Sequence, residues 1–204
     1  MCVVRIMIID YVKEAKSILD NFKEEVPIAV YDLADEKDIS VLISQKSDVN
    51  KNSGSAEIIK GIFIVSSLLE DPEFKNKLGT IKGNQKCKSF SLFLYTANPL
   101  ERRLIVAYYI GLVHLYFKQT ITAQEVVNNA VLSSIDITSP FYTLALNILV
   151  PESKLVDILR DEGVNNYDAQ NIPSVMNKLS ELFLISKVDM ERRLEKKAVG
   201  NEGC

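Results

Sequence analysis

Apolar positions at three- and four-residue steps dominate the chain and predict a protein built mainly of helices. In residues 8–22 charged residues separate the apolar ones, which is the pattern of an amphipathic helix. A short second helix is predicted for residues 28–37, after Pro27. Residues 101–117 are apolar almost all round, and this predicts a helix buried on most of its sides.

Three short segments between these helices predict strands, because they are rich in β-branched residues or alternate apolar and polar positions. They are residues 39–44, 58–65 and 89–95. The polar stretches 44–55 and 78–88 predict the loops between them. A helix followed by three strands indicates a small antiparallel sheet. We therefore expect an α+β fold that is rich in helices and contains a three-stranded sheet.

The second half of the chain is predicted to be helical throughout. Helical patterns cover residues 122–129, 142–150 and 151–160, and a loop follows at 161–166. Two further helices, 172–183 and 188–198, predict a C-terminal helical pair. We expect one domain over residues 1–204, in which 1–97 hold a helix and the sheet, 98–160 the buried helices, and 161–204 the helical pair and a tail.

Composition and charge exclude several classes of protein. The chain has 204 residues, of which 47% are hydrophobic and 25% charged, and no apolar run reaches the ~18–20 residues of a membrane span. A net charge of −3 provides no broad positive field for non-specific nucleic-acid binding. The apolar start of the chain has no small-residue cleavage site, and the three cysteines lie far apart. Both observations predict a cytoplasmic protein.

Residues able to carry out chemistry are few. His114 is the only histidine, and Cys2, Cys87 and Cys204 are widely separated, so the sequence has no closely spaced zinc ligands. We expect no metal and no cofactor. His114 lies in an apolar run, which favours a packed histidine over a catalytic one. A hydrolase with an unconventional site around His114, Tyr108 or Glu125 remains an alternative, without a visible pair of base and nucleophile.

Residues 91–115 resemble part of the ImmA/IrrE family of zinc metallopeptidases. In that family a strand and a turn lead to an arginine and then to an Ala-His-Glu-apolar-Gly-His helix, and Arg103, Ala107 and Gly111 match this pattern. Residues 142–151 are similar to the family's next helix, which closes on two apolar residues and a proline. Residues 179–194 are similar to its leucine-rich pair of short helices. The resemblance covers nearly the whole chain and implies a zincin-like fold.

The residues that bind zinc in that family are all replaced here. A zincin helix needs two histidines four residues apart on one face, with a glutamate beside the first. Tyr108, Tyr109 and Leu112 stand at these positions. The third ligand aligns near residues 138–140, which contain no carboxylate, and His114 faces away from the other positions at ~100° per residue. The resemblance thus implies a pseudoenzyme with no catalytic residue.

Tyr108, Tyr109 and Leu112 have two interpretations. Because they are bulky and largely apolar, they are predicted to fill the space that a metal would occupy. Alternatively, Tyr108 and Tyr109 line a groove that holds a peptide or a helix of a partner.

The predicted C-terminal helices are a second candidate surface. They have the length of a helix-turn-helix and carry a basic cluster at residues 192–197 that suits phosphates. Acidic residues are interleaved with the basic ones, as on a solvated helix face, which argues against direct binding of nucleic acid. The candidate residues for binding a protein partner are Tyr109, Leu182, Lys187, Arg192 and Arg193.

Members of the ImmA/IrrE family are commonly encoded beside helix-turn-helix repressors of phages and mobile elements, and act upon them. The resemblance therefore implies a transcription regulator that binds such a repressor stoichiometrically. It would act as an antirepressor by shifting the repressor between states. A protein inhibitor or antitoxin that blocks a nuclease or a defence complex is an alternative that the sequence does not separate from this one.

Overall fold

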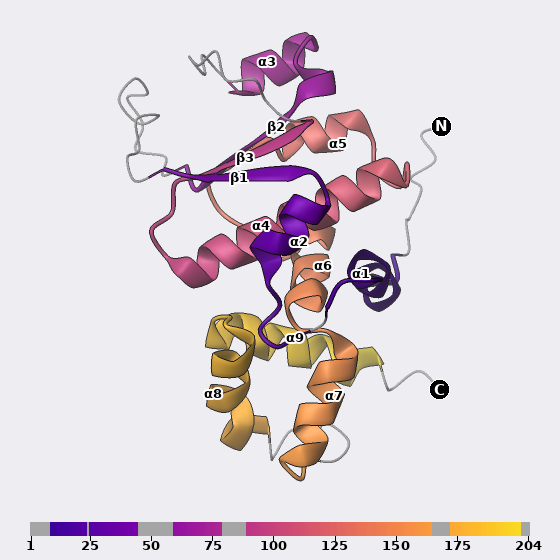
Figure 1. Ribbon diagram of the computed structural model, residues 1–204, viewed down its shortest axis with the longest axis vertical. Helices are drawn as coiled ribbons and strands as arrows, with labels where there is room; N and C mark the ends of the chain where they lie inside the picture. Colours follow the sequence, from indigo (N-terminus) through magenta and orange to yellow (C-terminus); the bar gives the residue numbers. More distant parts are fainter. Residues whose placement is uncertain (1–8, 24, 45–58, 79–88, 165–171, 201–204) are drawn as a thin grey trace.

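The computed structural model describes residues 9–23, 25–44, 59–78, 89–164 and 172–200 (Figure 1). Helices make up most of these segments, and a small sheet lies at one end. The helices are α1 (Tyr11–Leu19), α2 (Val30–Glu36), α3 (Pro72–Leu78), α4 (Pro99–Phe117), α5 (Ala123–Asn128), α6 (Pro140–Leu149), α7 (Glu152–Asp161), α8 (Ile172–Phe183) and α9 (Lys187–Gly200). The strands are β1 (Ile39–Ile43), β2 (Gly61–Val65), β3 (Phe90–Leu94) and β4 (Val131–Leu132). The α+β class is confirmed.

The sheet contains all three predicted strands, but its topology differs from the expectation. Its order is β1-β3-β2-β4, and β3 runs parallel to β1 and antiparallel to β2. The prediction of a three-stranded antiparallel sheet is therefore wrong. β4 has only two residues, which is too short for an alternating pattern to reveal. Pairing order is a tertiary property, and the periodicity of a single strand does not determine it.

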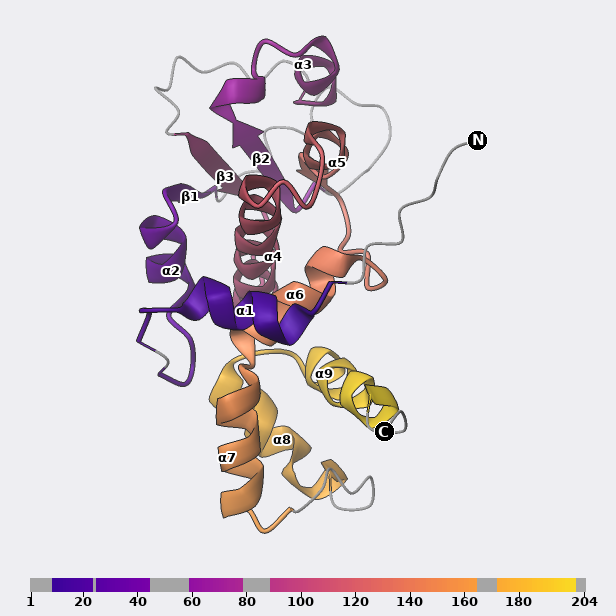
Figure 2. The same cartoon turned by 90° about the vertical axis from the view of Figure 1, so that its right-hand side faces the viewer.

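Helix α4 is the centre of the fold. The Asn98 side chain accepts from the backbone N–H groups of Leu100 and Glu101, and Pro99 takes the first helical position, so the helix has a strong start. Residues 104–113 are all buried, as the sequence predicts. The sheet lies along one side of α4, while α1, α2, α5 and α6 contact it elsewhere (Figure 2).

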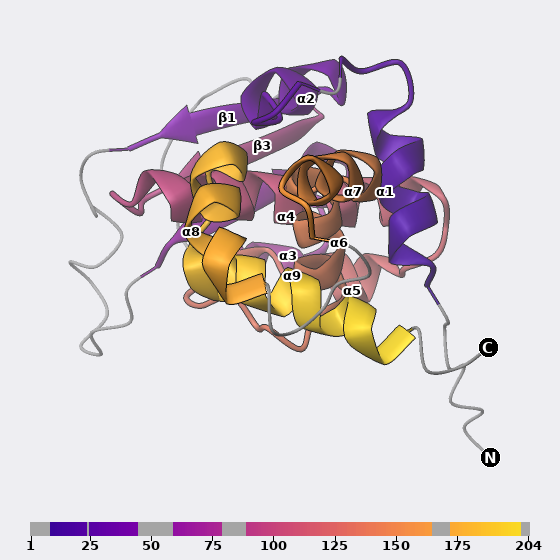
Figure 3. The same cartoon turned by 90° about the horizontal axis from the view of Figure 1, so that it is seen from below.

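The last three helices lie at the end of the molecule opposite the sheet. α9 contacts both α6 and α8, and from below α7, α8 and α9 are seen in front of α4 (Figure 3). α8 ends at Phe183, after which Leu184 takes a left-handed conformation with φ 50°. The backbone N–H of Ile185 then donates to the carbonyl of Ser180, which closes the helix end.

Helix α3 is absent from the sequence-based expectations. The Asp71 carboxylate accepts from the backbone N–H groups of Glu73 and Phe74, and Phe74 is buried. The cap at Asp71 and the buried Phe74 thus define this short helix. One buried residue is too few to produce a helical pattern of apolar positions. The predicted loops at 44–55 and 78–88 lie outside the described residues, apart from Ser44 and Leu78.

A charged cluster fixes α1 to the end of α4. The Glu14 carboxylate accepts from His114 Nε2 at 2.7 Å and from Lys118 Nζ at 2.7 Å. His114 is thus a partly buried structural residue, in agreement with its expected packing. Burial raises the pKa of Glu14, but the hydrogen bonds from Lys118 and His114 outweigh this effect, and the pKa lies below its ordinary value.

We predict that Glu14→Gln lowers the free energy of unfolding by about 1 kcal/mol at neutral pH. The pKa of Glu14 is lower in the folded protein than in the unfolded chain, so its stabilisation is present at neutral pH and is lost as the pH falls through the folded-state value. The difference between variant and wild type should therefore shrink in acid. Urea denaturation at several pH values measures it, with the exposed Glu25 as Glu25→Gln for control. A difference that is constant with pH would contradict this role.

Candidate functional site

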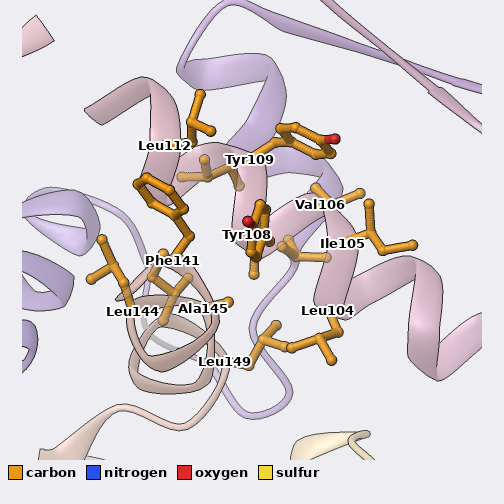
Figure 4. Close-up of a cluster of buried hydrophobic side chains, with 14 of the residues drawn as sticks. Leu104, Ile105, Val106, Tyr108, Tyr109, Leu112, Phe141, Leu144, Ala145 and Leu149 are labelled. Atoms are coloured by element: carbon orange, nitrogen blue, oxygen red, sulfur yellow. The ribbon is translucent and has the colours of Figure 1, made fainter. Parts of the chain in front are cut away.

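Tyr108 and Tyr109 project from the middle of α4 into the core, and their rings meet edge-on with centroids 5.4 Å apart. The Tyr109 ring stacks on Phe63 of β2, with centroids 4.7 Å apart, and has no exposed surface (0%). The Tyr108 ring meets Phe141 of α6 edge-on at 5.5 Å (Figure 4). Together the two rings fill the space between the sheet and α6.

Both phenol groups donate to Asn129, the residue that ends α5. Tyr108 Oη lies 2.5 Å from Asn129 Oδ1, and Tyr109 Oη lies 2.8 Å from the Asn129 carbonyl oxygen. Asn129 Nδ2 in turn donates to the Glu125 carbonyl at 2.8 Å. The buried hydroxyls are therefore satisfied, which removes most of the cost of placing them in the core. The sequence reasoning missed Asn129, whose only signal is its place at the end of a helix.

The electrostatics keep both phenols neutral. Burial and the neighbouring Tyr108 raise the pKa of Tyr109 well above its ordinary value. Burial also raises the pKa of Tyr108, and this outweighs the opposite effect of its hydrogen bond with Ser139. Since each phenol keeps its proton and donates it to Asn129, neither acts as a base at neutral pH.

Gly111 lies at the contact between α4 and α6, and Leu112 is the next residue along α4. Leu112 is buried, and a Cβ at Gly111 would lie 3.0 Å from Leu144 Cδ2 of α6. A residue with a Cβ at this position would therefore require the Leu144 side chain to move by a few tenths of an ångström. Tyr108, Tyr109 and Leu112 are all core residues, and their place in a former metal site stays a prediction.

The expectation that Tyr109 contacts a partner needs correction. Its side chain is enclosed by β2 and α4, and its hydroxyl is already bonded to Asn129. The sequence alone could not show which side of the buried helix α4 faces the sheet, and so it could not show that the Tyr109 ring is enclosed.

Segment 138–140, which aligns with the missing third ligand, does lie beside Tyr108. Ser139 is the N-cap of α6, and its Oγ is 3.4 Å from Tyr108 Oη. The other residues of the unconventional hydrolase site do not converge here. His114 bonds to Glu14, and the Glu125 carboxylate caps α5 through Thr122. Within the described residues, no group of three His, Cys, Asp or Glu side chains is close enough to hold a metal ion.

A second candidate region lies where α8 turns into α9. We call it the α8–α9 corner and define it by four exposed residues: Leu182, Leu184, Lys187 and Val188. Val188 is the most exposed of its apolar side chains, at 58%. Two of the predicted partner-binding residues, Leu182 and Lys187, thus lie on the surface, and Arg192 is half-buried.

Arg193 is not a surface residue, and its predicted role in binding a partner needs correction. Its side chain is only 4% exposed. Its Nε donates to the Val150 carbonyl at 3.2 Å, and its Nη2 lies 3.0 Å from Glu152 Oε2. Arg193 therefore anchors α9 to the junction of α6 and α7. A long cationic side chain on an amphipathic helix can face inward when hydrogen-bond acceptors are available there for its guanidinium group.

The chain matches no protein-family model, no curated protein sequence and no solved structure. Among the helices described here, none is both long and apolar enough to cross a membrane. Inference about function therefore rests on the residues and their contacts.

We predict that Tyr108→Phe and Tyr109→Phe each lower the free energy of unfolding by about 1 kcal/mol. Each substitution keeps the ring contacts and leaves one oxygen of Asn129 without its donor. Tyr116→Phe is the matched control, because Tyr116 lies on the same helix but is only half-buried. Chemical denaturation measures the three variants. Equal stability of all of them would show that the bonds to Asn129 contribute nothing net.

Proposed function

We propose that this chain is a non-catalytic member of the ImmA/IrrE family with a zincin-like fold, and that it acts as an antirepressor. In this proposal it binds a helix-turn-helix repressor in the cytoplasm without cleaving it. The observation that carries the proposal is the filled site on α4. Tyr108, Tyr109 and Leu112 stand at the positions of the zinc ligands and base, and all three are core residues.

The spatial relation of these positions supports the resemblance. In a zincin the two helix ligands lie on one face, and a third ligand approaches from another element. Tyr108 and Leu112 are four residues apart on α4, and Ser139 at the start of α6 lies next to Tyr108. A third ligand at position 139 would thus be close to the first ligand position.

Loss of the ligands changes how such a protein can act. Without a metal-bound water and a base, the family's hydrolysis has no means to proceed. An effect on a repressor must then come from binding one of its states more tightly than another, and it is limited by that difference in affinity. The protein is accordingly expected to act in a stoichiometric complex.

The α8–α9 corner is the surface that we assign to the partner. Leu184 is unfavourable for the stability of the free protein in two ways. Its left-handed backbone conformation disfavours a residue with a Cβ, and its apolar side chain is exposed. Arg103 fixes this geometry, because its Nε donates to the Leu184 carbonyl at 3.2 Å and its Nη2 to the Ile28 carbonyl at 3.0 Å. A partner that covers the corner would bury the exposed apolar side chains.

The first experiment combines the purified protein with helix-turn-helix repressors of phages and mobile elements, one at a time. We expect a complex by light scattering, repressor of intact mass, and at least a tenfold loss of the repressor's affinity for its operator. Val188→Glu should weaken the complex at least tenfold, about 1.4 kcal/mol, by placing a charge in the apolar contact. Ile137→Glu is the matched control, since Ile137 is an exposed apolar residue outside the corner.

Two results would contradict the antirepressor proposal. One is shortened repressor after incubation, which would indicate cleavage. The other is unchanged affinity for the operator at saturating protein. A complex that survives Val188→Glu but shows both expected effects on the repressor would overturn only the assignment of the surface.

A second experiment tests the zincin-like fold by rebuilding the site. The variant Tyr108→His/Leu112→His/Ser139→Glu places two imidazoles four residues apart and a carboxylate beside the first. We expect it to bind one zinc ion per chain, and its thermal stability to rise with zinc. The control Tyr108→His/Leu112→His lacks the third ligand and should bind zinc at least tenfold more weakly.

Metal content and circular dichroism, each with and without zinc, measure the outcome. A folded triple variant that binds no zinc would contradict the zincin-like arrangement. Stoichiometric zinc in the wild-type protein, lost in His114→Ala, would instead support the unconventional hydrolase.

A further inference from the structure

An open groove of about 490 Å³ lies between α1 and the junction of α6 and α7. In Figure 2 α1 crosses the molecule directly above the start of α7. The groove is lined by Val12, Ala15, Lys16 and Leu19 from α1, and by Asn147, Pro151, Glu152 and Ser153 from the other side. It shares no residue with the filled site on α4 or with the α8–α9 corner.

Asn147 supplies a buried acceptor that has no partner. The side chain is 6% exposed, and its Nδ2 donates to the Thr143 carbonyl at 2.9 Å. This contact fixes the orientation of the amide, because only the N–H end can donate to a carbonyl. Asn147 Oδ1 is then left buried without a hydrogen bond in the described molecule. An unpaired buried acceptor lowers the stability of the folded protein, so a donor that enters the groove and reaches it is favoured.

The start of α7 lies at the same groove. α7 has ten residues and begins at Glu152 after Pro151, and the Pro151 side chain makes no capping hydrogen bond. The first N–H groups of a helix carry a partial positive charge and attract anions. Lys16, a cationic residue, lies on the opposite wall. The Glu152 carboxylate is also part of the lining, but its charge is offset by Arg193 at 3.0 Å.

The rest of the lining is mainly apolar. Val12, Ala15 and Leu19 form one wall, and Pro151 lies on the other. Val12 is among the exposed large apolar residues of the molecule. A ligand would therefore gain affinity by placing an aliphatic group between α1 and Pro151.

We infer that this groove binds an α-amido carboxylate with an aliphatic side chain. Its amide N–H donates to Asn147 Oδ1, its carboxylate lies near the first turn of α7 and Lys16, and its side chain contacts Val12 and Leu19. This chemistry occurs in a free N-acyl amino acid and at the C-terminus of a peptide. The inference is independent of the proposed antirepressor function, because it uses none of the same residues.

Calorimetric titration of the full chain with N-acetyl-leucine and with a five-residue peptide ending in leucine tests the inference. We expect at least one of them to bind. The matching C-terminal amide and the ester analogue, in which oxygen replaces the amide N–H, should each bind at least tenfold more weakly, the factor for one hydrogen bond of about 1.4 kcal/mol. Binding of both ligands identifies the free amino-acid derivative as sufficient, and binding of the peptide alone identifies a chain end.

Variants test the residues assigned to the ligand. Asn147→Leu and Lys16→Gln should each weaken binding at least fivefold, whereas Lys13→Gln, on the part of α1 outside the lining, should not change it. Asn147→Leu also removes the unpaired acceptor, so its melting temperature should be no lower than that of the wild type, and lost binding is then not lost folding.

Three results would overturn the inference: no binding of either ligand, equal binding of the amide or the ester, or unchanged binding by Asn147→Leu. If Asn147→Leu proves unstable, the inference is tested by Lys16→Gln and the ester analogue alone, and unchanged binding in both would overturn it. Lys16 is exposed, so its substitution leaves the core intact.

Discussion

The close contact between α4 and α6 determines where the other elements can lie. At this contact the absence of a Cβ at Gly111 leaves room for the Leu144 side chain, and the Tyr108 and Phe141 rings meet edge-on. Because α4 is buried on nearly every side, each of its faces needs a partner. The sheet is bound through Tyr109 and Phe63, α5 through Asn129, and α1 through the Glu14 cluster. The packing around α4 also positions the elements that form the α8–α9 corner and the groove beside α1.

The elements that the sequence reveals best are those with many buried positions, and the nearly continuous apolar run of α4 is the clearest case. The α+β class and the three main strands follow from the same patterns. The parallel pairing of β1 with β3 does not, because both strands would show the same pattern in either direction. β4 and α3 are too short to produce a signal, and tertiary contacts define them.

The two tyrosines and Arg193 show why a candidate site was harder to predict than the fold. The sequence identifies the positions on α4 where ligands are absent, but burial alone decides whether Tyr109 is core or surface. Arg193 belongs to a charged stretch that looks solvated, yet its guanidinium group binds the backbone at Val150. The roles of Asn129 and Asn147 become visible only from their contacts. Asn129 accepts from both tyrosine hydroxyls, and Asn147 Oδ1 is an acceptor without a donor among the described residues.

The way Tyr109 is held has a consequence for how this sequence can change over generations. A histidine or glutamate there would leave a cavity against Phe63 and remove the bond to Asn129. Loss of a buried aromatic side chain costs about 3–5 kcal/mol, a large share of the 5–15 kcal/mol that stabilises a typical domain. A return of the base at position 109 thus begins with a substantial loss of stability. The packing of Tyr109 therefore opposes the return of a catalytic base at this position. We expect substitutions to be tolerated more readily at the surface than in this part of the core.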